Sequence, residues 1–362
     1  MVHLCFVCET PFHLLNCINY SYHVREDVSV DLYVRQEDYL NEDMIDRVRN
    51  EGLFENVYSY SYEKDRFHSF SGKRYRFYDI LFPGMMLKKL LRSSVDIGKK
   101  HYNYIYCAVP TDFVRMLLML QKEAVVRYYD DGVGSYTDNI EASVTKKQLL
   151  LSRLLHRTYP NLTPQYIYLN NVEMCEPGAQ KKAKRLPSIA EASTELKGII
   201  GRVFSYQEDD LYENHRIVYL TQPNDSESDD YEKVNQEIER VLAEYKEQCL
   251  VRVHPRQMGD YSSDLFIDTS NNMWELVCPR HIRGDHVLIS ACSTAQVTPK
   301  MFFGREPWLV FTYKLYGDFF SQKNITTIET MISLIKGSYH DPEKIIIPEN
   351  HQEFEMELKK II

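Results

Sequence analysis

Apolar residues fall into two kinds of segment along this chain: short continuous runs, and longer stretches with helical spacing. The run VHLCFVC has the composition of a buried strand. Thr10-Pro11 then begins the helical stretch PFHLLNCINYSYHV, since proline fits the first turn of a helix. Strands are predicted in this way at residues 2–8, 28–34, 105–109 and 124–129, with helical patterns at 11–24, 40–52 and 111–122. Such alternation with short connections predicts βαβ units around a parallel sheet.

The alternation restarts near Arg216. Strands are predicted in RIVYLTQP, QCLVRVHP, DLFIDT, HVLISACST and WLVFTY, with helices over residues 229–246, around MWELV and over the final HQEFEMELKKII. We therefore predict an α/β fold with two Rossmann-like domains that face a central cleft, because open α/β sheets bind ligands outside the carboxyl ends of their strands. The predicted boundaries are residues 1–195 and 196–345 for the two domains, and 346–362 for a helix that packs at the domain junction.

The composition is that of a globular protein. Of the 362 residues, 44% are hydrophobic and 26% are charged, which differs from a disordered chain. The net charge of −9 argues against a nucleic-acid partner, because nucleic-acid binders usually carry an excess of basic residues. The opening VHLCFVCETPF lacks a basic leader and is interrupted by Pro11, and no run approaches the roughly 20 apolar residues that span a bilayer. We therefore expect a cytoplasmic protein.

The cysteines and acidic residues do not predict a metal centre. The eight cysteines are scattered, mostly in apolar segments, which favours buried free thiols in a reducing compartment. Cys5 and Cys8 form a C-x-x-C, but within a strand residues three apart face opposite sides, and no second Cys/His pair follows at zinc spacing. Asp43 and Asp46 lie on a predicted helix, and no convincing D-x-D motif occurs elsewhere. We expect neither a metal nor a cofactor.

The stretch RYYDDGVGSYT places two carboxylates and two glycines directly after a predicted strand. Gly132 and Gly134 allow a tight turn, which can hold Asp130 or Asp131 at the end of the strand, where a carboxylate can act as a general base. An ordinary surface turn is the competing interpretation, since D-G is common in turns.

Two further motifs follow predicted strands of the second half. His254-Pro255-Arg256 ends LVRVHP, where the histidine can donate to a phosphate or protonate a leaving group, and Arg252 and Arg256 would add positive charge. Ser293-Thr294 follows HVLISAC at a predicted helix N-terminus, which favours an anion. A capping histidine and an ordinary helix cap are the structural alternatives.

A fourth feature, Thr221-Gln222-Pro223, closes the strand IVYL, at the position where a nucleotide-binding half normally meets its ligand. The following NDSESDD carries Asp225, Asp229 and Asp230 and is expected to be a solvated loop, although it could supply a carboxylate. Neither a G-x-G-x-x-G dinucleotide loop nor a G-x-x-x-x-G-K-[ST] phosphate loop occurs, which argues against dehydrogenases and P-loop enzymes. A metal-free transferase with a nucleotide-activated donor fits these features best.

In this order, D-D-G, H-P and S-T, each at a strand end, resemble the signature of the bacterial sialyltransferases. The opening ETPFHLL and the YLTQP strand look most like the family 52 glycosyltransferases, which sialylate lipooligosaccharide and capsule, and the resemblance spans residues 2–340. It implies a GT-B architecture, a CMP-sialic acid donor, inversion at the anomeric carbon and no essential metal. The first domain would then bind the glycan acceptor and the second the donor.

The resemblance also implies roles for individual residues. Asp130 would face the cleft as the base, with Asp131 bracing the turn, and His254 would contact the donor phosphate and act as the acid. The other implied contacts are Gln222, Pro223, Pro255, Arg256, Ser293 and Thr294 with the donor, and Thr10, His13 and Gly132 with the acceptor. The base could instead come from the loop of Asp225–Asp230. Alternative functions are a related enzyme that uses CMP-Kdo or a UDP-hexose, and a non-catalytic capsule-assembly protein.

A basic island at residues 145–187 interrupts the acidic chain. It carries Lys146, Lys147, Arg153, Arg157, Lys181, Lys182, Lys184 and Arg185 against two glutamates. KKQLLLSRLLHR has amphipathic helical spacing, which would suit the anionic inner face of a membrane, a homodimer contact, or a core helix with a solvated basic face. EPGAQKKAKRLPS is predicted to be an exposed loop, followed by a helix opened by a serine cap in SIAEASTELKGIIGRVF.

Overall fold

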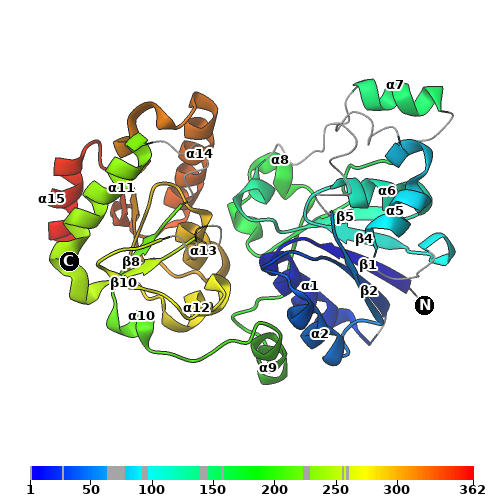
Figure 1. Ribbon diagram of the computed structural model, residues 1–362, viewed down its shortest axis with the longest axis horizontal. Helices are drawn as coiled ribbons and strands as arrows, with labels where there is room; N and C mark the ends of the chain where they lie inside the picture. The colour runs from blue at the N-terminus through cyan, green and yellow to red at the C-terminus, as the bar shows by residue number, and fades with distance from the viewer. Residues whose placement is uncertain are drawn as a thin grey trace. The chain divides into compact units, whose positions relative to one another are not determined.

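The computed structural model divides the chain into two compact units, residues 1–204 and 205–362 (Figure 1). It describes residues 2–26, 28–62, 78–91, 97–137, 146–155, 159–222, 229–254, 257 and 261–362. Each unit is built on its own parallel sheet.

The described part of the first unit contains a seven-stranded sheet in the order β3-β2-β1-β4-β5-β6-β7, with every pair parallel. Its strands are β1 (Val2–Cys8), β2 (Val28–Arg35), β3 (Asn56–Tyr60), β4 (Tyr104–Cys107), β5 (Val125–Tyr129), β6 (Ile167–Leu169) and β7 (Ala183–Arg185). Its helices are α1 (Pro11–Val24), α2 (Glu42–Asn50), α5 (Pro83–Leu90), α6 (Asp112–Leu120), α7 (Lys146–Leu154), α8 (Pro177–Gln180) and α9 (Thr194–Val203).

Aromatic contacts place helices on both faces of this sheet, as Figure 1 shows. Tyr20 of α1 packs against Phe6 and Tyr106, which are register partners on one face. Phe113 of α6 stacks on Tyr60 and packs near Tyr33 on the other face. Burial of these rings on both faces explains why the central strands read as continuous apolar runs.

The described part of the second unit contains a six-stranded sheet in the order β10-β9-β8-β11-β12-β13, again parallel throughout. Its strands are β8 (Ile217–Leu220), β9 (Cys249–Arg252), β10 (Phe266–Ile267), β11 (Val287–Ser290), β12 (Trp308–Phe311) and β13 (Ile345–Ile346). Its helices are α10 (Leu211–Asn214), α11 (Asp229–Leu242), α12 (Trp274–His281), α13 (Thr294–Phe303), α14 (Gln322–Ser338) and α15 (His351–Ile361).

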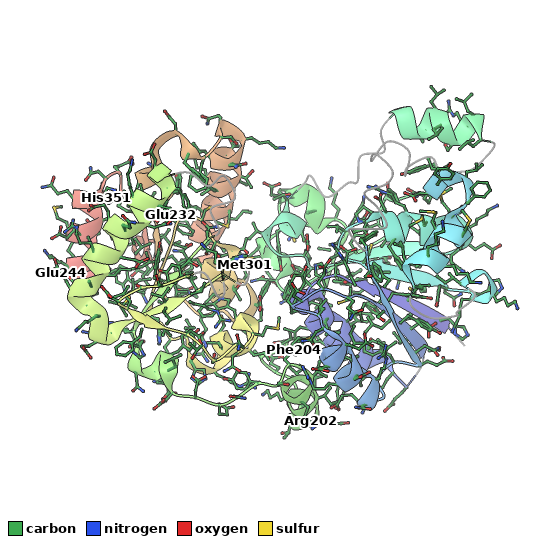
Figure 2. All side chains as sticks on the ribbon, viewed as in Figure 1. Arg202, Phe204, Glu232, Glu244, Met301 and His351 are labelled. Carbon is green, nitrogen blue, oxygen red and sulfur yellow. The ribbon has the colours of Figure 1, made fainter. Side chains whose placement is uncertain are left out.

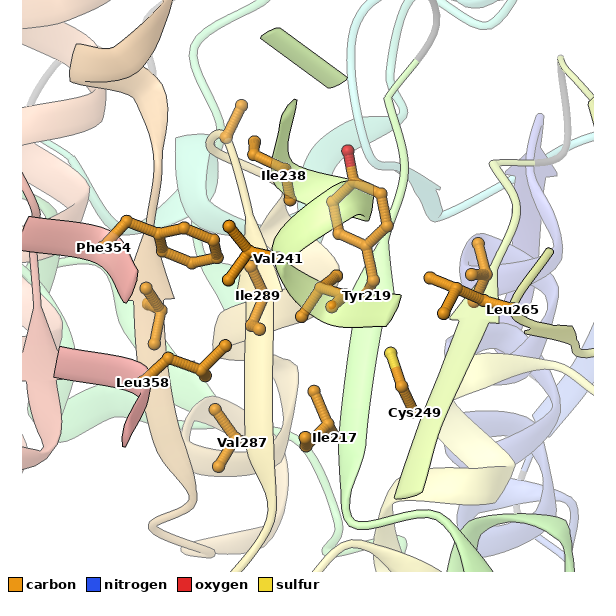
Figure 3. Close-up of a cluster of buried hydrophobic side chains, with 14 of the residues drawn as sticks. Ile217, Tyr219, Ile238, Val241, Cys249, Leu265, Val287, Ile289, Phe354 and Leu358 are labelled. Atoms are coloured by element: carbon orange, nitrogen blue, oxygen red, sulfur yellow. The ribbon is translucent and has the colours of Figure 1, made fainter. Parts of the chain in front are cut away.

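The core of the second unit joins the sheet to α11 and α15. Ile217 and Val287 of the central strands are fully buried with Val241 of α11, and Phe354 and Leu358 of α15 complete the cluster (Figure 3). The final helix is therefore part of the second unit and not a separate element. Its predicted contact with a domain junction stays a prediction.

The predicted strands and helices of both halves are confirmed, but three predictions about their limits are wrong. The first unit ends at Phe204 and not at residue 195, because α9 packs on α1 and α2 and Arg202 pairs with Glu51. Arg202 and Phe204, at the end of α9, are labelled in Figure 2. The predicted serine cap is confirmed as Ser193, whose hydroxyl accepts the N–H of Leu196, but the helix begins at Thr194 and not at the start of SIAEAST. The predicted loop EPGAQKKAKRLPS contains α8 and the edge strand β7.

Candidate functional site

Each sheet has a point where the strand order reverses, and several of the predicted site residues follow the strands beside it. In the first unit the reversal lies between β1 and β4, and Thr10 and His13 follow β1. In the second it lies between β8 and β11; Gln222 follows β8, and Ser293 follows β11. The carboxyl ends of strands at such a reversal are where open α/β sheets bind ligands.

In the first unit, His13 joins the β1–α1 turn to the D-D-G turn. The Thr10 hydroxyl caps α1 by accepting the His13 N–H, so the histidine is fixed in the first turn of the helix. His13 Nδ1 accepts the backbone N–H of Glu9 at 3.3 Å, and its Nε2 lies 2.6 Å from Asp131 Oδ1. Because Nδ1 is an acceptor, the proton is assigned to Nε2, which donates to the Asp131 carboxylate.

Asp131 is the accessible carboxylate of this turn. Its side chain is 40% exposed, whereas that of His13 is 4% exposed. Its backbone N–H donates to the Ser135 hydroxyl, which fixes the turn, and no described residue donates to its second oxygen, Oδ2. One carboxylate oxygen is therefore held by a buried imidazole while the other stays available to a ligand.

Asp130 has the opposite environment and is fully buried. It accepts hydrogen bonds from the Tyr136 hydroxyl at 2.5 Å, from the Gly132 N–H at 2.9 Å, and from the backbone and side-chain amides of Asn170 at 3.1 and 2.9 Å. Burial raises the pKa of Asp130, against the opposing effect of these hydrogen bonds. The expectation that Asp130 is the accessible carboxylate and Asp131 the brace is therefore wrong: Asp130 is buried and braces the turn, and Asp131 is accessible. Which of the two acts as a base stays a prediction.

The glycine after this pair is required by the backbone. Gly132 has φ +100°, a conformation that side chains with a Cβ rarely adopt. It turns the chain at once into the short 3₁₀ helix Val133–Tyr136, which returns Ser135 and Tyr136 to the two aspartates. The predicted contact of Gly132 with an acceptor stays a prediction.

Asn16 and Asn170 were missed by the sequence analysis. Asn16 is buried in α1 and donates to the Asp130 carbonyl, and the Asn170 amide bridges Asp130 and Asn16. Two features of the sequence pointed to them: Asn16 lies among apolar residues of a predicted helix, and the polar pair Asn170-Asn171 directly follows IYL. Neither signal identifies a partner, since these contacts connect residues far apart in the chain.

We expect Asp130→Ala to lower the free energy of unfolding of the first unit by about 2–3 kcal/mol, because each buried donor left without an acceptor costs about 1–3 kcal/mol. The matched control is Asp131→Asn, which keeps an acceptor for the buried His13 Nε2 and should change this energy by less than about 0.5 kcal/mol. Urea denaturation measures both. Equal stability of the two variants would contradict the structural role of Asp130.

In the second unit, Thr221 ties the end of β8 to the end of β9. Its hydroxyl accepts the backbone N–H of His254 at 2.9 Å and donates to Gln257 Oε1 at 2.8 Å. The His254 carbonyl accepts the N–H of Gln257 at 2.8 Å. These bonds hold the backbone of His254 and do not involve its imidazole, which is half-buried at the strand end.

Gln222 ties the same strand end to β11. Its Oε1 accepts the backbone N–H of Cys292 at 3.1 Å, and the Cys292 thiol approaches the same oxygen at 3.3 Å. Burial raises the pKa of that thiol, which keeps it protonated as a donor. Because the side-chain carbonyl oxygen of Gln222 already accepts these bonds, a ligand would bond to the two N–H groups of its amide.

Ser293 and Thr294 lie at the N-terminus of α13, as predicted. The Ser293 hydroxyl caps the helix by accepting the N–H of Ala295, and Thr294 is exposed. Pro299 lacks the N–H that would bond the Ala295 carbonyl, and the Trp274 indole donates to that carbonyl at 2.6 Å. The helix is therefore well supported at an end whose dipole favours an anion.

Arg252 does not provide charge for a ligand, contrary to the prediction. Its guanidinium donates to Asp268 at 2.5 Å and to the Tyr212 hydroxyl at 2.7 Å, and it also bonds the Asn272 carbonyl. Burial alone would raise the pKa of Asp268, but Arg252 and the hydrogen bonds from Tyr212 and Ser270 hold it below its usual value. Arg252 belongs to a structural ion pair.

We expect Arg252→Met to lower the free energy of unfolding of the second unit at pH 7 by about 2–3 kcal/mol, below the 3–5 kcal/mol typical of a broken buried pair, because Arg252 is 19% exposed. The lowered pKa of Asp268 contributes stability that is present above the unfolded pKa of about 3.9 and is lost as the pH falls through the folded value. The variant should lose this pH dependence. The control is Arg240→Met, which breaks an exposed pair and should cost less than about 0.5 kcal/mol. An unchanged acid profile in Arg252→Met would contradict this account.

Several predicted residues lie outside the described part of the chain. These are Pro223, Asp225, Pro255 and Arg256, together with the side chain of Asp229. Asp230 is exposed and pairs with Lys233, three residues along the same helix. Within the described ranges, no cluster of three or more histidine, cysteine or acidic side chains is arranged to bind a metal ion.

The helix of the basic island is short. In α7, Leu149, Leu150 and Leu154 are exposed, and so is Arg153. Among the described helices, none is long and apolar enough to cross a bilayer. The predicted contact with a membrane surface and the predicted homodimer stay predictions.

Sequence comparison does not place the chain in a family. No protein-family model matches it, and no curated protein sequence matches it.

Solved structures share its fold at very low sequence identity. The kitacinnamycin glycotransferase matches with a TM-score of 0.52 and 9% identity over 99% of this chain and 90% of that one. S. aureus MnaA in its co-structure with UDP matches with a TM-score of 0.52 and 10% identity over 100% and 88%. The spinosyn rhamnosyltransferase SpnG, complexed with thymidine diphosphate, matches with a TM-score of 0.50 and 10% identity over 100% and 91%. The chain has a two-domain α/β fold of the GT-B type.

Proposed function

We propose that this protein is a glycosyltransferase that moves a sugar from a nucleotide donor to a hydroxyl group of a glycan. The observation that carries the proposal is the Asp131 carboxylate, held on one oxygen by the buried His13 and accessible on the other. The strand ends of the second unit supply the complementary chemistry: amide and hydroxyl donors at a helix N-terminus, where an anion is favoured. Structures of the same fold carry nucleotides, namely UDP and thymidine diphosphate.

We propose further that the donor is CMP-sialic acid and the acceptor a lipooligosaccharide or capsule glycan. The sequence motifs support this choice. CMP leaves through a single phosphate, which a helix dipole, two hydroxyls and His254 can stabilise. A diphosphate donor more often calls for a metal ion or a larger cationic clamp.

The proposed reaction is a direct displacement. The acceptor oxygen attacks the anomeric carbon while Asp131 takes its proton, and the bond from that carbon to the phosphate oxygen breaks with its electron pair leaving on CMP. Attack opposite the leaving group inverts the configuration. Ser293, Thr294 and the Gln222 amide donate to the phosphate, and His254 donates to it or protonates it as CMP leaves.

Titration with nucleotides tests the donor. We expect isothermal titration to show binding of CMP in preference to UDP and GDP, and CMP-sialic acid to be hydrolysed slowly without an acceptor. Binding of UDP but not CMP would mean that the donor is a UDP-sugar, and the proposal of a glycosyltransferase would still hold. No nucleotide binding and no donor hydrolysis would favour a non-catalytic assembly protein of this fold.

We expect His13→Ala to lower kcat by roughly 10- to 100-fold, because it frees the Asp131 carboxylate, and a misplacement of about 1 Å can cost about 10²-fold. KM for the acceptor should change much less than kcat. His13→Gln should recover part of the activity, because its amide can donate as Nε2 does. Steady-state kinetics of transfer measure both. No rescue by glutamine, together with an equal loss in thermal stability, would reduce His13 to a packing residue.

A further inference from the structure

One face of the first sheet carries a row of aromatic and basic side chains along β4 to β7. In register, Tyr106 of β4 lies beside Arg127 of β5, and Tyr168 of β6 lies beside Lys184 of β7. Tyr104 stands two residues before Tyr106 and so shares its face. We call Tyr104, Arg127, Tyr166, Tyr168 and Lys184 the tyrosine–arginine platform.

The guanidinium of Arg127 is surrounded by rings. Its Cζ lies 3.5 Å from the ring centroid of Tyr104, 5.7 Å from that of Tyr106 and 5.6 Å from that of Tyr166. Nε donates to Gln165 Oε1 at 2.9 Å and Nη1 to the Tyr106 hydroxyl at 2.7 Å. Stacking and these bonds hold the planar guanidinium in one orientation.

No carboxylate pairs with the cations of the platform among the described residues. Lys184 Nζ lies 4.9 Å from the centroid of Tyr166, so this lysine and Arg127 approach the same ring. Burial alone would lower the pKa of Arg127, but the neighbouring tyrosines raise it, with the hydrogen bond to Tyr106 as the largest of their effects. A half-buried guanidinium without a counter-ion is unusual, since charges removed from water are normally paired. In a chain with a net charge of −9, this arrangement points to an external anion.

We propose that the tyrosine–arginine platform binds an anionic oligosaccharide. Half-buried tyrosine rings offer flat apolar surfaces with a polar edge, against which the apolar face of a sugar ring can pack. Arg127 keeps N–H donors that no described residue accepts, and these can bond a carboxylate or phosphate group on the sugar. The choice of a glycan as the ligand rests on the proposed function.

The platform is separate from the D-D-G turn. Tyr104 begins β4, Tyr166 precedes β6, and Arg127 is the third residue of β5, so this part of the platform lies away from the carboxyl ends of the strands. Tyr168 lies nearer the turn, in register with Tyr129. A glycan held there would be bound outside the reacting hydroxyl. The platform would raise the affinity for a long anionic acceptor without taking part in the displacement.

A glycan fits this surface better than a lipid bilayer does. The apolar area of the platform comes from half-buried tyrosines and the exposed Val125, which pairs with Tyr104. Membrane-binding surfaces instead insert protruding leucine, phenylalanine or tryptophan side chains. In this unit the exposed leucines are on α7.

Binding of a sialic acid tetramer to the full-length protein tests the proposal, with maltotetraose as the neutral probe. We expect saturable binding of the tetramer by isothermal titration, a Kd at least tenfold higher in Arg127→Gln, and a Kd about fivefold higher in Lys184→Glu. Lys336→Glu, the same charge reversal on an exposed lysine of the second unit, is the control and should leave the Kd unchanged. If Arg127→Gln fails to fold, the Kd for the tetramer is compared in Tyr104→Leu and Lys184→Glu instead.

Equal Kd values in the folded platform variants and the control would overturn the proposal. So would equal binding of maltotetraose, or platform-dependent binding of phosphatidylglycerol vesicles without binding of the tetramer. Donor hydrolysis, measured in the same variants, separates this proposal from the proposed function. Donor hydrolysis should be unchanged in the platform variants. If the wild type binds the tetramer through Arg127 but hydrolyses no donor, only the proposed transferase function is refuted.

Discussion

Asp131→Asn is expected to lower kcat for sugar transfer by about 10²–10⁴-fold, the usual contribution of a well-placed general base. Asparagine keeps the size of the side chain and can still accept the hydrogen bond of His13 Nε2, but it cannot take the proton of the acceptor hydroxyl. Binding of the donor should be unaffected, because no part of the donor site proposed in the second unit is altered. Turnover of CMP-sialic acid with a glycan acceptor, followed by chromatography, measures this loss.

The control for Asp131→Asn is its unfolding curve. Because the Asp131 side chain is 40% exposed, the variant should unfold at nearly the wild-type urea concentration. Wild-type turnover in a correctly folded Asp131→Asn would exclude Asp131 as the base. It would favour a base from the loop of Asp225–Asp230 instead.

His254→Ala is expected to lower kcat by about 10²–10³-fold, the loss that follows removal of one donor to a developing negative charge. The backbone of His254 is held by the Thr221 hydroxyl and by Gln257, so the turn should persist when the imidazole is removed. CMP release from CMP-sialic acid in single-turnover experiments reports on this step.

Thr221→Val provides a matched comparison for His254→Ala. It keeps the size of residue 221 and removes the hydroxyl that anchors the His254 backbone. We expect a smaller loss of turnover than in His254→Ala, because the imidazole is still present but less well positioned. Full activity of His254→Ala would contradict its role in departure of CMP, whatever the behaviour of Thr221→Val.

The architecture could be predicted from sequence because buried parallel strands leave a strong local signal. Continuous apolar runs such as VHLCFVC, YIYC and VLIS correspond to β1, β4 and β11. The short β6 and β7 leave almost none: IYL and AKR have three residues each, and the lysine and arginine of β7 suit an edge strand. Such strands are specified by their neighbours in the sheet more than by their own residues.

The D-D-G turn was found from sequence, but the roles of its two aspartates were not. Which of two adjacent carboxylates turns inward depends on partners distant in the chain, since Asn170 bonds Asp130 and His13 bonds Asp131. Likewise, Arg252 was expected to meet an anion because it lies near His254, but its partner Asp268 follows another strand. Local motifs indicate where polar groups gather, and the tertiary contacts decide what each one does.

A crystal structure with CMP-3-fluorosialic acid, an unreactive donor analogue, and a glycan acceptor tests the central claim most directly. The account predicts that the acceptor hydroxyl oxygen lies about 2.6–3.2 Å from the carboxylate of Asp131, with the CMP phosphate at the N-terminus of α13. An acceptor hydroxyl bonded to a different carboxylate, with Asp131 remote from it, would contradict the account.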